Sequence, residues 1–416
     1  MGVSVDSEDV AWLNQSRTLQ EVQRYGSNLE REVRNLLDWD GGRVPYSKEY
    51  GYKIQVDCTW QNLQNPLAIA SVTYSNPDTP GHSNENKLQL KLGELALLKN
   101  RYPKLRAILV IGGTEEAWLP YVLKAFDYFY DEVVHLWDEK GFDRLNEIRS
   151  NPTIVENKHQ SFWDSLREIW ANREAMFVQA TIPRGLVRYE VLDMLKADAG
   201  HESPSEIKNA IARRCMQASF AEGGTEWNHY RQQNWGAIEM SRSYFNPQEA
   251  IVDLSLNAGN FKFSGGLAKD VEVRSFLHQL GMDKTKLSED FVLYSRALQK
   301  PVYIQCKASG GGRNQHGKNI QNRTKEQVAR GILYSANLNE EGNLSLDEND
   351  FHWVGVLDGN WDVTQSEKHK YVHMLHIAGY SKLFAGSDLV DEAFDVLPAE
   401  LNPLVSYLIS LDCETV

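Results

Sequence analysis

The pattern PVYIQCKA at Pro301–Ala308 predicts a strand with Gln305 and Lys307 on one face, two residues apart. If the turn ALQK joins this strand to the preceding one in a hairpin, Asp290 faces Lys307 and Val292 faces Gln305. Directly opposed side chains of an antiparallel pair have Cβ atoms about 4.5–5.5 Å apart. We therefore expect a carboxylate, a primary amide and an amine to share one polar patch. Such groups are used in metal binding and proton transfer.

An aspartate followed, fourteen residues later, by Gln-x-Lys on a hairpin with a helix on either side resembles the PD-(D/E)xK nuclease superfamily. The resemblance covers about 263–385, and the polar loop and basic helix after the lysine strand are similar to those of type II restriction endonucleases. It implies Mg²⁺-dependent cleavage of double-stranded DNA at a specific sequence. Asp290 and Gln305 would hold the Mg²⁺, and Lys307 would orient or deprotonate a water molecule.

The chain departs from this family pattern at two positions. Glu289 stands where a proline is usual, and Gln305 replaces the usual acid. Because an amide oxygen is a weaker metal ligand than a carboxylate, we expect a second carboxylate to assist. Glu272 on the preceding helix is the expected additional metal ligand, and Glu326 on the following helix is a second catalytic candidate.

The charge distribution supports a nucleic-acid contact after the lysine strand. Six Lys or Arg residues and one acid lie between Lys307 and Arg330, a local charge of +5 in a chain of net charge −13. Arg pairs well with guanine, and Asn or Gln pairs well with adenine. The expected DNA-binding residues of this segment are Ser309, Arg313, Asn314, Gln315, His316, Lys318 and Arg323.

The polar, Trp- and Arg-rich middle of the chain is expected to help read the bases. Its candidate DNA-binding side chains are Arg213, Arg214, Trp227, His229, Arg231, Gln232 and Gln233. The same composition also suits a helical linker. The resemblance further implies a homodimer, because a symmetric protein matches symmetric half-sites.

The expected fold class is α/β, with two similar mixed-sheet segments on either side of a helical middle. We expect an α/β domain at 1–145, a helical DNA-recognition domain at 146–262 and a catalytic domain at 263–416, whose restriction-endonuclease-like core spans 263–390. The predicted helices are 27–38, 87–100, 115–130, 203–219, 269–280, 317–335 and 367–380. The predicted strands are 52–60, 66–74, 106–111, 133–137, 291–296, 301–308, 352–358 and 382–385.

The segment 1–145 holds a rival site. Asp57 ends a strand, but its partner strand carries Ser71 and Thr73 where an acid and a lysine would stand. Either this segment is a degenerate copy that serves in dimer contacts or DNA binding, or it is the working site. In the second case the charges have moved to the helix, at Lys87, Lys91 or Glu94.

Two other function classes remain open. Gly312–Asn319 nearly matches a phosphate-binding P-loop and predicts a nucleotide hydrolase, although Asn319 replaces the hydroxyl residue that binds Mg²⁺. A catalytically silent DNA-binding protein is the other alternative.

Composition sets outer bounds. The chain has 416 residues, and its net charge excludes binding to nucleic acid by bulk charge alone. Four cysteines without paired spacing predict free thiols in a reducing cytoplasm, and no apolar run is long enough to span a membrane. The N-terminus has no secretory signal pattern.

Overall fold

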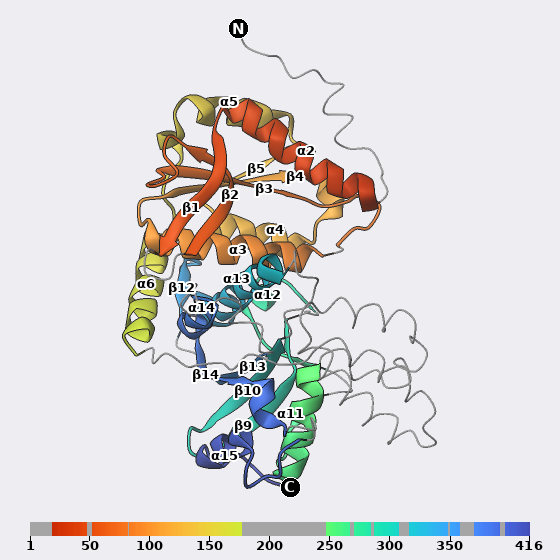
Figure 1. The fold of residues 1–416 in the computed structure, drawn as a ribbon. Coiled ribbons are helices and arrows are strands. Elements are labelled where there is room, and N and C mark those ends of the chain that lie inside the picture. Colours follow the sequence, from red (N-terminus) through yellow and green to blue (C-terminus); the bar gives the residue numbers. More distant parts are fainter. Residues whose placement is uncertain are drawn as a thin grey trace. The chain divides into compact units, whose positions relative to one another are not determined.

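The computed structural model describes residues 19–47, 52–81, 83–176, 247–266, 270–283, 287–307, 316–347, 350–357, 370–391 and 396–416 (Figure 1). The chain forms two compact units. Unit 1 comprises 1–171, 275–284 and 325–347, and unit 2 comprises 172–274, 285–324 and 348–416. The chain therefore passes between the units several times, and the expected boundaries after residues 145 and 262 do not coincide with the units.

Unit 1 contains a five-stranded sheet in the order β1-β2-β3-β4-β5. The pairs β1–β2 and β2–β3 are antiparallel, whereas β3–β4 and β4–β5 are parallel. The strands are β1 (Asp40–Ser47), β2 (Tyr52–Trp60), β3 (Ala68–Tyr74), β4 (Arg106–Gly112) and β5 (Glu132–His135). The main helices are α2 (Leu19–Leu37), α3 (Asn84–Arg101), α4 (Pro120–Phe129), α5 (Glu139–Ser150) and α6 (Gln160–Ala175).

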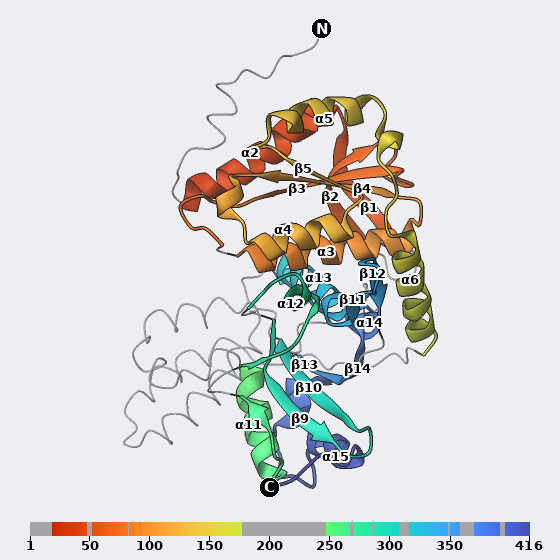
Figure 2. The same ribbon diagram turned by 180° about the vertical axis from the view of Figure 1, so that it is seen from behind.

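Helices cover both faces of this sheet, with α2 and α5 on one face and α3 and α4 on the other (Figures 1 and 2). Burial on both faces explains why β3 and β4 are almost continuously apolar. On α2 the side chains of Leu29, Val33 and Leu37 recur at helical spacing and pack into the core against the sheet. The pattern of the sequence predicted β2 to β5, but β1 was missed, because its Gly41, Gly42 and Pro45 are poor strand formers.

Unit 2 repeats the topology of unit 1. Its sheet has the order β6-β9-β10-β13-β14, with antiparallel pairs β6–β9 and β9–β10 followed by parallel pairs β10–β13 and β13–β14. The expectation of two segments with one element order is confirmed. The strands are β6 (Ser264–Gly265), β9 (Phe291–Ser295), β10 (Lys300–Lys307), β13 (His352–Leu357) and β14 (Tyr380–Ala385). The helices are α11 (Pro247–Ala258), α13 (His316–Ser335), α14 (Lys370–Ala378) and α15 (Pro403–Ser410).

The core of unit 2 lies on one face of β10. Val302, Ile304 and Cys306 are buried there together with apolar side chains of α11 and α15. The other face carries Tyr303, Gln305 and Lys307. This alternation is the one expected from the sequence. Helix α13 begins in unit 2, and from Lys325 onward its residues belong to unit 1.

The helix expected at 269–280 is wrong. This segment forms β7 (Val271–Glu272), which pairs with β8 (Ser288–Glu289), and then the short helix α12 (Phe276–Gln279). Val271 and Val273 alternate with polar residues, which is the period of a strand rather than of a helix. The strands β11 (Ala336–Leu338) and β12 (Leu344–Leu346) form a further hairpin in unit 1. Among the described residues, no helix is both long and apolar enough to cross a membrane.

Candidate functional site

The hairpin β9–β10 brings Asp290, the residue before β9, next to Gln305. The pairs run from Ser295 with Lys300 to Phe291 with Ile304, and one further step joins 290 to 305. The expected register, with Asp290 opposite Lys307 and Val292 opposite Gln305, is wrong by two residues. The turn is formed by 296–299 rather than by ALQK, with Gln299 in the left-handed region at φ 53°.

Asp290 and Gln305 are in direct contact. The Gln305 side-chain amide donates a hydrogen bond to Asp290 Oδ2 at 2.5 Å, and the backbone N–H of Cys306 donates to the same oxygen. Asp290 is 6% exposed and Gln305 1% exposed, so this carboxylate is held at a nearly buried position by N–H donors. Such donors compensate part of the cost of burying a charge.

Lys307 ends β10 on the same face as Gln305 and is half-buried. Two strand residues span about 7 Å, so the lysine backbone lies within one side-chain length of the Gln305 position. The Cys306 thiol on the opposite face has its pKa raised well above the usual value by burial, and then by the charges of Asp290 and Glu249, while Lys307 acts against them. Three acids, Asp290, Glu249 and Glu289, therefore act on the Cys306 thiol together with Lys307.

Two acids, one acting on Cys306 and one next to Asp290 in the chain, were not candidates from the sequence. Glu249 lies on α11 and contributes to the pKa of the Cys306 thiol. Glu289 is fully buried, and its Oε2 accepts a hydrogen bond from the Trp353 indole at 3.0 Å. No sequence spacing could have located Glu249, because it lies more than fifty residues before the start of β10 along the chain.

The other predicted site residues have varied positions. Glu272 is exposed on β7 opposite Ser288, not on a helix. Glu326 is half-buried on the part of α13 that belongs to unit 1, and Arg323 on the same helix is exposed. For His316 and Lys318 only the helical backbone is described. The residues that lie outside the described parts are Arg213, Arg214, Trp227, His229, Arg231, Gln232, Gln233, Ser309, Arg313, Asn314 and Gln315.

The basic segment is less exposed than its sequence suggests. Lys325 is 6% exposed and pairs with Glu94, and Arg330 is 9% exposed and donates to the side chain of Gln89. These two cations contribute to the local charge of the sequence but are engaged within unit 1. Arg323 is the arginine of this helix that the structure describes as exposed.

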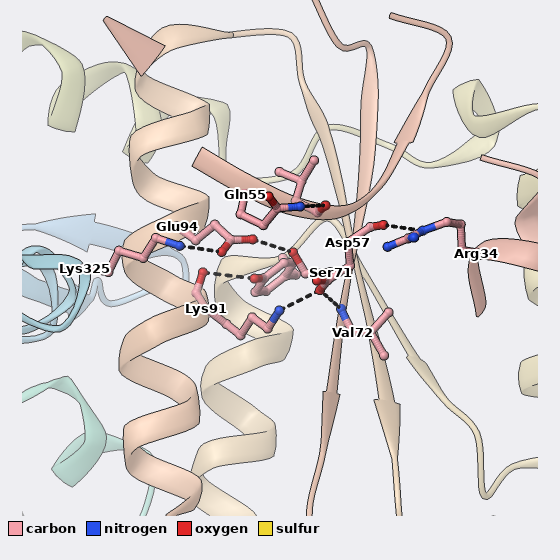
Figure 3. A network of polar contacts seen from close by, with 10 residues as sticks. Arg34, Gln55, Asp57, Ser71, Val72, Lys91, Glu94 and Lys325 are labelled. Atoms are coloured by element: carbon pink, nitrogen blue, oxygen red, sulfur yellow. Dashed lines mark hydrogen bonds and ion pairs between the residues drawn. The ribbon is translucent and has the colours of Figure 1, made fainter. Parts of the chain in front are cut away.

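Unit 1 has a related corner at the matching place of its sheet (Figure 3). Asp57 comes just before the pair of Cys58 with Ala70 in β2 and β3, as Asp290 comes just before the pair of Phe291 with Ile304. The backbone N–H of Val72 donates to Asp57 Oδ2 at 2.7 Å, which parallels the bond from Cys306 to Asp290.

A cation from α3 completes this corner in unit 1. Lys91 donates to Asp57 Oδ2 at 2.7 Å, and Glu94, one turn further, accepts from Ser71 at 3.3 Å. The sequence hypothesis that charges of this copy had moved to α3 named both of these residues, and the structure brings them together with Asp57.

The unit 2 patch offers one carboxylate and one primary amide to a cation. Among the described residues there is no group of three or more His, Cys, Asp or Glu side chains arranged to hold a metal ion. Asp290 and Gln305 nevertheless bring a carboxylate and an amide together, and Mg²⁺ characteristically takes few protein oxygens and keeps several waters.

In comparisons with known proteins, no family model, no curated protein and no solved structure matches the chain.

Proposed function

We propose that the protein is a Mg²⁺-dependent endonuclease that hydrolyses phosphodiester bonds of double-stranded DNA at a specific sequence, with its active site at the Asp290 corner of unit 2. The observation that carries the proposal is the contact between Asp290 and Gln305 on a strand whose same face also presents Lys307. The order β6-β9-β10, α13, β13, α14, β14 supports a restriction-endonuclease-like core.

Each side chain then has a defined task. Asp290 and Gln305 would hold Mg²⁺, and the ion, when bound, stabilises negative charge on the scissile phosphate. The Lys307 amine would orient or deprotonate the attacking water. Glu272 of β7, which pairs with Ser288 of β8 just ahead of Asp290, would be the assisting carboxylate.

The DNA itself would be held by cations close to this corner. Arg323 is exposed on the helix that follows the lysine strand, and phosphate contacts supply most of the affinity of such proteins. A homodimer would present two such sites to the two strands of a symmetric sequence.

The test is digestion of phage DNA by the full chain and by Lys307→Ala, with Mg²⁺ and with EDTA. We expect discrete bands from the parent protein with Mg²⁺, no cleavage with EDTA, and a rate lower by about 10²-fold or more for Lys307→Ala, because it removes a proton-transfer group. The matched control is Lys300→Ala, at the other end of β10, which should cleave normally. Full activity of Lys307→Ala would contradict the proposal.

A second location for the same activity is favoured by one observation, the contact of Lys91 with Asp57 in unit 1. If this corner cuts DNA, Lys91→Ala loses cleavage and Lys307→Ala keeps it. A protein that retards DNA but never cleaves it, with Mg²⁺ or Mn²⁺, would be the silent binding protein.

A further inference from the structure

In the corner of unit 1 around Asp57, the acidic side chains are paired with cations of the chain itself. Asp57 Oδ2 receives both the Val72 N–H and the Lys91 ammonium, and the Asp57 and Lys91 side chains are 13% and 17% exposed. Glu94 receives the Ser71 hydroxyl on one oxygen and the Lys325 ammonium on the other at 3.0 Å. Figure 3 shows the Lys325 ammonium reaching Glu94 and the Lys91 ammonium reaching Asp57 within this network.

Acidic and basic groups balance around Asp57. Glu30 of α2 is the third acid whose charge acts here, and its pKa is raised by burial first and by Asp57 next. Arg34 donates to the backbone carbonyl of Asp57 and provides the third cation beside Lys91 and Lys325. Burial lowers the pKa of Lys91, but Asp57 and Glu94 raise it more, so this lysine stays charged.

We propose that the Lys91 ammonium is a built-in cation in unit 1, occupying the place next to Asp57 that a divalent ion would take next to Asp290, so that unit 1 folds around its acids without a metal. Only the comparison with Asp290 rests on the proposed function. The physical argument is one of desolvation: two acids in nearly buried positions need a cation close by, and here the chain supplies it from α3.

A direct consequence is that unit 1 holds a latent metal site. Removal of the Lys91 amine leaves the Asp57 carboxylate without the ammonium that it contacts, beside the hydrogen-bonded pair of Ser71 and Glu94. These are hard oxygen donors of the kind that Mn²⁺ and Mg²⁺ accept. The ammonium of Lys325 still pairs with Oε2 of Glu94. The negative charge left without a cation is therefore mainly that of Asp57.

The test counts bound Mn²⁺ by electron paramagnetic resonance in an Asp290→Asn background, which removes the unit 2 carboxylate from the count. We expect no bound Mn²⁺ in that background, one Mn²⁺ per chain after adding Lys91→Ala, and none again after adding Asp57→Asn. The control is Lys99→Ala on the same helix, whose buried ammonium pairs with the single carboxylate of Asp131 and should open no site.

Thermal unfolding provides the second readout. In the same Asp290→Asn background, Lys91→Ala should lower the unfolding temperature in EDTA and Mn²⁺ should restore it, whereas the double variant Asp57→Asn/Lys91→Met should show no response to Mn²⁺. The proposal is overturned if the Asp290→Asn protein binds Mn²⁺ through Asp57, or if Lys91→Ala neither binds Mn²⁺ nor is stabilised by it. Neither outcome depends on cleavage, so a failure of the endonuclease proposal would be seen separately.

Discussion

The Asp290 carboxylate is held by two N–H donors from β10. Its Oδ2 accepts from the Gln305 amide and from the Cys306 N–H, and both side chains of the pair are nearly buried. An amide can donate to a carboxylate without adding charge, which a glutamate at 305 could not do. Gln305 therefore pairs with Asp290 in the folded protein without a bound cation.

Gln305→Glu tests whether a cation belongs in this corner. The variant opposes two carboxylates, which raises the pKa of one of them and costs about 1–3 kcal/mol at neutral pH in the absence of metal. Because the raised pKa belongs to an acid, the loss of stability should be present above that pKa and should disappear as the pH falls below it and the acid is protonated. We expect Mg²⁺ to raise the unfolding temperature of Gln305→Glu more than that of its parent. Equal responses to Mg²⁺ would argue against a cation at this place.

At the scale of elements, helix α3 and the later part of α13 approach very closely within unit 1. A Cβ added to Gly93 would lie 2.1 Å from the backbone oxygen of Lys325. The absent side chain thus lets the two helices meet at the level where Lys325 reaches Glu94. A backbone oxygen cannot rotate away as a flexible side chain could, so the helices would have to separate.

Gly93→Ala should therefore destabilise the protein by about 1–3 kcal/mol through overpacking, although alanine favours helix by up to about 1 kcal/mol. The control is Gly26→Ala on α2, where an added Cβ meets no atom within 4 Å. That variant should be neutral or more stable by about 0.5–1 kcal/mol. Chemical denaturation of both proteins measures the two differences. A stabilised Gly93→Ala would show that the helices adjust without cost.

At the scale of the whole molecule, the net charge of −13 repels a DNA backbone, whereas the basic segment after β10 attracts it. Of the six cations between Lys307 and Arg330, Lys325 and Arg330 are buried in contacts with Glu94 and Gln89. The surface available to a phosphate backbone is therefore smaller than the sequence count implies.

Arg323→Ala should weaken DNA binding uniformly across sequences and reduce the slope of log affinity against log salt by about one phosphate contact, roughly 0.9. The matched control is Arg31→Ala, an arginine on α2 whose side chain is 63% exposed. It should leave the salt slope unchanged. Fluorescence anisotropy with labelled duplex, in EDTA to prevent cleavage, gives both slopes. An unchanged slope for Arg323→Ala would remove this helix from the DNA contact.

What the sequence alone determined is local: apolar runs and alternation gave most strands of both sheets, including β2 and β10 and the two faces of β10, because residues there are close along the chain. The tertiary structure alone decided the rest. It fixed the turn at 296–299, and so moved Asp290 from Lys307 to Gln305, because the backbone of Gln299 adopts a left-handed conformation that composition does not reveal. It also brought Lys325 to Glu94, which is 231 positions away in the sequence. This pairing is set by how the helices pack, and no spacing in the sequence indicates it.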